Sequence, residues 1–185
     1  MASRFPNVKF EENPRELSHP TLRFLRSYWE EKRGGRAMPS RADIRPSQIR
    51  EHLPWIVMLD VLPGLKDFRY RLIGTLVTRY FNADATGQTI SEAWASQGGD
   101  GVRGLLGILR DVARNKVVLR LYGEKDWSSF GLEKFESLYL PLSDDGENVN
   151  VILQAFVFNP PEVLLAREIM RTNGGELPHI PKLSA

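Results

Sequence analysis

The apolar positions between residues 55 and 81 change their period from that of a strand to that of a helix. Residues 55–62 are almost all apolar, include three β-branched side chains and are bounded by prolines, which predicts a buried strand. Residues 68–72 alternate Phe, Arg, Tyr, Arg, Leu, so the aromatic rings and Leu72 are expected on one face of a second strand. Residues 76–81 have helical spacing. A strand is therefore predicted to lead directly into short helices.

A long amphipathic helix and three β-rich segments are predicted after that. Over residues 102–113 the apolar side chains recur at i, i+3, i+4 and i+7, and arginines occupy the opposite side. Residues 117–122, 135–142 and 149–158 are rich in β-branched and aromatic side chains, and the turn sequence SDDGEN joins the last two. No helix separates these three segments, so the sequence favours antiparallel over parallel pairing.

The first amphipathic helix is predicted near the front of the chain, over residues 20–33. Pro20 suits a first helical turn, and the pair Gly34-Gly35 suits the end of a helix. The apolar stripe is broad, so the helix must pack on the domain's own sheet or on a second subunit. We take this stripe as the candidate dimer or partner surface, formed by Leu22, Phe24, Leu25, Tyr28 and Trp29.

A chain of 185 residues is long enough for one well-buried core and short for two. We expect a flexible arm at 1–17, one domain at 18–160 and a C-terminal extension at 161–185. No apolar run approaches the roughly 18 residues that span a bilayer, and the N-terminus lacks the apolar stretch of a secretory signal. We therefore expect a cytoplasmic protein with no membrane partner.

Basic residues are concentrated at the front of the chain. Residues 1–50 contain 11 Lys and Arg against 6 Asp and Glu, whereas the remainder contains 14 against 17. This Arg-rich region raises nucleic-acid binding as one alternative function. No dense basic run interleaved with aromatic residues is present, which argues against that alternative.

Five motifs, together with Trp29, resemble PAS domains, in particular the small stand-alone PAS proteins of bacteria. The resemblance covers roughly residues 20–160. It implies an α+β fold, in which a five-stranded antiparallel sheet carries helices on one face, with an N-terminal flanking helix in addition. It also implies that the short helices after the second strand enclose a cavity over the sheet. The motifs are MPSRADIRP (38–46), LPWIVMLDV (53–61), FRYRLIGT (68–75), ATGQTI (85–90) and FESLYLPLSDDG (135–146).

The residue types present restrict the chemistry that such a domain can perform. The chain has no cysteine, which excludes the flavin–cysteine adduct of photosensors with this fold. Haem-binding members usually take an axial histidine from the long middle helix, but His19, His52 and His179 all lie outside residues 101–115. No grouping of His, Asp and Glu has the spacing of a metal site. We name no catalytic residue, no metal ligand and no cofactor.

An apolar ligand pocket is the remaining candidate site. The elements that would surround a PAS cavity contribute mostly aromatic and leucine side chains, and two tyrosine hydroxyls would need partners when buried. A small apolar or aromatic ligand would fit such a pocket. The alternative is that these side chains simply fill the interior. The candidates are Tyr70, Leu72, Tyr80, Phe81, Trp94, Leu105, Leu109, Phe135, Tyr139 and Phe156.

The leading hypothesis is a cytoplasmic PAS-type sensor or adaptor that regulates signalling by binding a small ligand, a partner protein or both. We expect a homodimer, an unidentified signalling protein as partner, and no catalytic activity. A second hypothesis is a small-molecule enzyme on a related cone-shaped α+β fold, for which the strands offer chiefly Gln154 and Tyr139. Nucleic-acid binding is the third.

Overall fold

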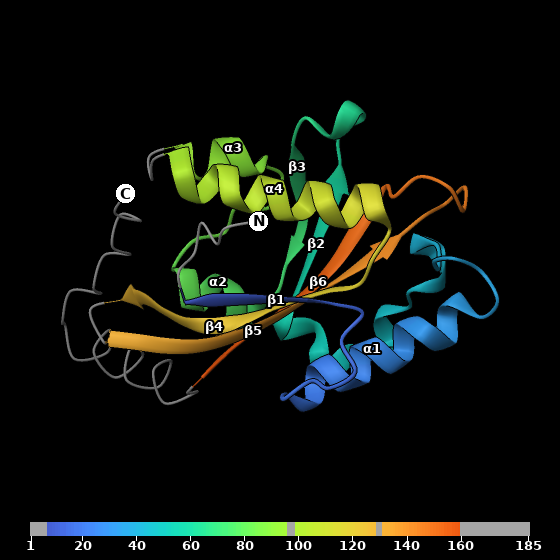
Figure 1. Cartoon of the computed structure of the whole chain (residues 1–185), viewed down its shortest axis with the longest axis horizontal. Coiled ribbons are helices and arrows are strands. Elements are labelled where there is room, and N and C mark those ends of the chain that lie inside the picture. The colour runs from blue at the N-terminus through green and yellow to red at the C-terminus, as the bar shows by residue number, and fades with distance from the viewer. Residues whose placement is uncertain (1–6, 96–98, 129–130, 160–185) are drawn as a thin grey trace.

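The computed structural model of the chain describes residues 7–95, 99–128 and 131–159. Its centre is one antiparallel sheet with the strand order β1-β4-β5-β6-β2-β3 (Figure 1). The predicted α+β class and antiparallel sheet are confirmed, with a sixth strand added at one edge. The strands are β1 Val8–Glu12, β2 Ile56–Val61, β3 Phe68–Ile73, β4 Leu119–Ser128, β5 Gly131–Leu142 and β6 Val151–Asn159.

The additional strand, β1, lies in the segment that the sequence predicts to be an arm. It pairs with β4, from Val8 opposite Gly123 to Glu12 opposite Leu119. A Cβ at position 123 would overlap the carbonyl oxygen of Asn7, so glycine allows the two strands to approach. The predicted C-terminal extension at 161–185 lies outside the described residues. Residues 160–170, whose sequence PPEVLLAREIM suggests a helix, lie outside them as well.

Helices cover both faces of the sheet (Figure 1). Helix α1 (Pro20–Arg33) packs on one face, where it contacts β5 and β6. Helices α2 (Thr75–Phe81), α3 (Ile90–Ala93) and α4 (Gly99–Asn115) lie over the other face. Short 3₁₀ turns complete the layer that leads from α1 to β2; they are Arg41–Asp43, Pro46–Gln48 and Arg50–Trp55, and a further turn, Pro63–Leu65, joins β2 to β3.

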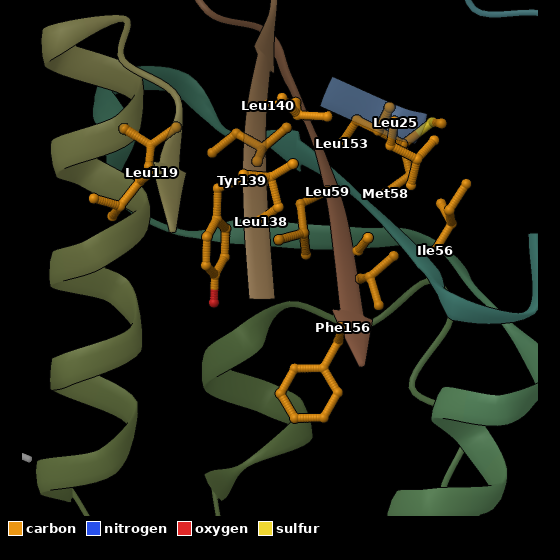
Figure 2. Packing of buried hydrophobic residues seen from close by; sticks show 14 of the residues in the cluster. Leu25, Ile56, Met58, Leu59, Leu119, Leu138, Tyr139, Leu140, Leu153 and Phe156 are labelled. Atoms are coloured by element: carbon orange, nitrogen blue, oxygen red, sulfur yellow. The ribbon is translucent and has the colours of Figure 1, made fainter. Parts of the chain in front are cut away.

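The apolar stripe of α1 is buried against the chain's own sheet. Leu22 and Leu25 are fully buried, and Figure 2 shows Leu25 next to Met58 of β2. The indole Nε1 of Trp29 donates a buried hydrogen bond to the carbonyl oxygen of Pro141 in β5, at 2.8 Å. This contact satisfies the polar atom of a large buried ring, so α1 is fixed in position as well as buried.

A buried carboxylate fixes the beginning of α1 to the sheet. Glu136 of β5 accepts hydrogen bonds from the backbone N–H groups of Ser18 (3.1 Å) and His19 (3.3 Å). Arg120 of β4 donates to the same carboxylate at 2.7 Å, which balances the buried negative charge. The ring Nδ1 of His19 accepts from the backbone N–H of Thr21 and caps the helix.

The change from strand to helix at residue 74 depends on a close backbone approach. Gly74 follows β3 directly, and its N–H donates to the carbonyl oxygen of Ile56 at 2.7 Å. Its Cα faces the backbone of Leu53 and Pro54, and a Cβ there would overlap both carbonyl oxygens. Because all of these atoms belong to backbone, they cannot turn aside as a side chain would. Glycine at this position therefore permits β3 to lead straight into α2.

Replacing Gly74 with alanine is expected to lower the free energy of unfolding by about 1–3 kcal/mol, because overpacked sites destabilise by that amount. Urea denaturation measures the change. The matched control is Gly107→Ala in α4, where a Cβ would meet nothing within 4 Å. Alanine in that helix interior is expected to raise stability by about 0.5–1 kcal/mol. Equal effects of the two substitutions would contradict this account of Gly74.

Candidate functional site

A cavity of about 210 Å³ lies between the sheet and the helices α2, α3 and α4. The sheet side is formed by Val8, Val57, Leu59, Tyr70, Ile73, Leu121, Phe135, Tyr139, Gln154 and Phe156. The helical side, with the loop that joins α2 to α3, is formed by Val77, Phe81, Ala83, Ala85, Ile90, Ala93, Trp94, Gly101, Val102, Leu105 and Ile108. All six strands and three helices thus contribute to one apolar enclosure.

Seven of the ten pocket candidates lie at this cavity, namely Tyr70, Phe81, Trp94, Leu105, Phe135, Tyr139 and Phe156. Two others are buried but do not line it: Tyr80 stacks on Phe158 with 3.8 Å between ring centroids, and Leu109 of α4 is fully buried. Leu72 lies elsewhere, with 38% of its surface exposed. Whether the seven bind a ligand stays a prediction.

A β-bulge explains why Leu72 does not line the cavity. The register places Tyr70 opposite Leu59. It then places Leu72 opposite Met58, so Arg71 is an extra residue in β3. One extra residue moves all later side chains of the strand to the opposite face. The strict alternation predicted from the sequence is therefore wrong beyond Tyr70.

The same bulge brings Ile73 into the cavity, opposite Val57 of β2. Ile73 was not a candidate, because the sequence offers no signal for a bulge, and Val57 was not a candidate either. Val57 and Leu59 could have been found: they alternate along β2 with Ile56 and Met58, which belong to the opposite face of the strand. The prediction of a wholly buried strand treats the two faces alike and so does not separate them.

Four side chains with polar atoms stand among the apolar side chains of the cavity. The indole Nε1 of Trp94, at the end of α3, donates to the hydroxyl of Tyr70 on β3 at 3.0 Å. The amide Nε2 of Gln154 donates to the hydroxyl of Ser137 at 2.9 Å. The fourth of these side chains is Tyr139, whose ring Figure 2 shows directed away from the side chains packed around Leu25. These groups can select a polar atom on an otherwise apolar ligand.

Burial keeps both tyrosines of the cavity protonated. Desolvation raises the pKa of Tyr70 to about 12, although the hydrogen bond from Trp94 opposes the shift. Desolvation likewise raises the pKa of Tyr139 to about 12, against a hydrogen bond with Ser137. At neutral pH both phenols are therefore protonated, and they act as hydrogen-bonding groups and not as bases.

The cavity offers no charged group for acid–base chemistry among the described residues. No carboxylate, histidine, lysine or arginine lines it. The described residues also hold no cluster of three His, Asp or Glu side chains able to bind a metal ion. Separately, no helix in the described part of the chain has the length and apolar character needed to cross a membrane.

The candidate partner surface on α1 is largely inside the protein. Leu22, Leu25, Tyr28 and Trp29 are buried in the chain's own core, so of the two expected coverings of this stripe the structure has the domain's own sheet. Phe24 alone of the five stays on the surface, with 39% exposure, and it stacks on His52 at 4.2 Å between ring centroids. The apolar stripe of α1 is broad because the helix packs on the sheet of its own chain.

The two raised tyrosine pKa values predict a loss of stability at alkaline pH. In the unfolded chain these phenols release protons near pH 10, whereas in the folded chain they keep them to about pH 12. The unfolded state then binds fewer protons, so stability is full below pH 10 and falls by about 1.4 kcal/mol per pH unit for each tyrosine between pH 10 and about pH 12. Tyr139→Phe should reduce the slope of unfolding free energy against pH; an unchanged slope would contradict the burial of this phenol.

One family model matches the chain, and solved structures are similar to it. The model of the PAS domain family matches residues 17–156. Among solved structures, the chain is similar to an RNA-binding light-oxygen-voltage receptor, with 10% identity, a TM-score of 0.48, and coverage of 90% of this chain and 43% of the receptor. It is also similar to the PAS domain of BvgS from Bordetella pertussis, with 17% identity, a TM-score of 0.42, and coverage of 64% and 86%.

The chain thus spans less than half of the receptor's length, and no curated protein matches it. The family match begins just before α1 and ends within β6, so it includes every element that encloses the cavity except β1. Since that match extends over more than half of the sequence, this protein belongs to the PAS domain family.

Proposed function

We propose that this PAS domain is a sensor or adaptor of a signalling pathway that responds to a small apolar or aromatic ligand in its cavity. The observation that carries the proposal is the enclosure of about 210 Å³ over the sheet, which is apolar except for four hydrogen-bonding side chains. A domain with a fully packed interior would have no such space. Occupied and empty states of the cavity would then differ in the packing of α2, α3 and α4.

The size of the cavity points to a ligand with one or two rings. An apolar cavity of about 150 Å³ accepts benzene, and typical sites for drug-sized ligands begin at about 300 Å³. Aromatic side chains from α2, β5 and β6 line the enclosure, among them Phe81, Phe135 and Phe156. Their rings favour an aromatic guest through offset or edge contacts. One polar atom on the guest would suit Tyr139 or Gln154.

A catalytic role is not favoured. An enzyme would need a group that titrates near neutral pH within reach of its substrate. Among the described residues that line the cavity, the titratable side chains are two tyrosines, and desolvation raises the pKa of each to about 12. We therefore propose that the domain acts by binding alone.

Nucleic-acid binding through the Arg-rich front of the chain is also not favoured. Arg26 and Arg33 both pair with Glu30 on α1, and Arg36 pairs with Asp43. Arginines with carboxylate partners present less free positive charge to phosphates. The cytoplasmic location, the signalling partner protein and the homodimer expected from the sequence stay predictions.

Two substitutions of the same kind test the ligand site. Leu105→Trp places an indole ring at the cavity, and Leu72→Trp places the same ring at an exposed position outside the cavity. Indole serves as the probe. It should raise the thermal midpoint of the wild type and of Leu72→Trp, because a ligand that binds only the folded state stabilises it. Leu105→Trp should show no such rise.

A panel of benzene, phenol and indole extends the measurement by isothermal titration. Binding of any member by the wild type and its loss in Leu105→Trp supports the proposal. If all three fail to bind the wild type, or if Leu105→Trp binds as tightly as the wild type, the cavity is not the ligand site.

A further inference from the structure

Strand β1 has an outer edge whose backbone groups face away from the sheet. The N–H of Glu124 donates to the carbonyl oxygen of Asn7, and the N–H of Asn13 donates to that of Val118. In an antiparallel pair, residues whose backbone groups face the partner strand alternate with residues whose groups face away. The backbone N–H and C=O groups of residues 7, 9, 11 and 13 therefore face β4, and those of residues 8, 10 and 12 face outward. Within the described ranges, no strand pairs with this edge.

The side chains on this edge are arranged for pairing with themselves. Charged residues on an edge strand normally oppose strand addition. Here Lys9 and Glu11 carry opposite charges and stand symmetrically about Phe10, which is 45% exposed. This arrangement does not oppose pairing with a second copy of β1. In an antiparallel pair the second copy presents its charges in the reverse order, so each positive charge lies opposite a negative one.

We propose that two copies of this chain associate through β1, antiparallel to each other, with the two-fold axis at Phe10. Each Lys9 then lies opposite the partner's Glu11, and the two Phe10 rings lie beside each other. The backbone groups of residues 9 and 11 are directed toward β4. The charged pairs across the new interface are therefore non-hydrogen-bonded pairs, in which opposite side chains come closest. The result is one continuous sheet through two domains.

The outward-facing backbone groups restrict the alternatives. Only even-numbered positions can bond across the new edge, so the strands can shift only in steps of two residues. One shift places Lys9 opposite the partner's Lys9. The shift in the other direction places Glu11 opposite the partner's Glu11. Like charges directly opposite each other are destabilising, so the register centred on Phe10 is the one that the charges select.

This interface goes beyond the proposed ligand binding and does not depend on it. The two features nevertheless meet in one strand, because Val8 of β1 lines the cavity while its backbone groups face the outer edge. Glu11 is held in place by Arg120 of β4, which contacts it at 3.0 Å. β1 is thus positioned by the domain before a partner arrives.

Single cysteines test the register, because the natural chain has none. Phe10→Cys places two thiols at a hydrogen-bonded pair with about 5.5 Å between Cα atoms, which suits a disulfide. Lys9→Cys and Glu11→Cys report the two shifted registers, and Leu72→Cys on β3 is the exposed control. Under mild oxidation, Phe10→Cys should form the intermolecular disulfide at least tenfold faster than the other three. Equal rates, or a faster rate at position 9 or 11, would overturn the proposal.

Sedimentation analysis of the full chain tests the charged pairs independently of any cysteine. Lys9 is exposed, so its replacement spares the core. Lys9→Glu should weaken the dimer at least tenfold, and Lys9→Arg, which keeps the charge, should leave it unchanged. A wild type that stays monomeric up to about 100 μM, a concentration that populates even micromolar dimers, contradicts the interface. So does a dimer that Lys9→Glu leaves intact.

Discussion

A sheet that is apolar on both faces must be covered on both, and this domain covers its two faces in different ways. On one face, a single long helix lays Leu22, Leu25 and Trp29 onto the strands and is anchored by hydrogen bonds to Pro141 and Glu136. On the other face, two short helices and one long helix leave a space of about 210 Å³ between themselves and the sheet. An empty apolar space of that size costs of order 5 kcal/mol relative to a filled one. A ligand that fills it would offset that cost, which is why the cavity is the centre of the proposed function.

Two local backbone features place the cavity where it is. The extra residue Arg71 turns Ile73 toward the helices and Leu72 away from them. One residue later, Gly74 lets the chain pass close to the backbone of Leu53 and Pro54 and enter α2 without a loop. A longer connection would move α2 off the sheet. The aromatic side chain that α2 contributes, Phe81, would then no longer lie at the cavity.

The sequence predicted the elements well because their periods are long and clear. The stripes of α1 and α4, the buried strand at β2 and the three late strands all persist over several repeats, and seven of the ten pocket candidates lie at the cavity. It missed β1 because five residues with three charges give a weak pattern at a sheet edge.

Two other errors have tertiary causes. A bulge has no sequence signature here, so the face of Leu72 could not be predicted. The apolar stripe of α1 shows that the helix is covered but not by what, and the structure covers it with the chain's own sheet. What a pattern cannot supply is the identity of the surface on the other side of a contact.

The most direct test of the unequal covering of the two faces is a crystal structure determined under xenon pressure, because xenon enters apolar cavities that lack solvent. Xenon density between Tyr139 and Leu105, with none between α1 and the sheet, is the result that we predict. Xenon absent from the helical side, with the side chains of α2 and α4 collapsed onto the strands, would show that both faces are packed alike and would remove the basis for a ligand site.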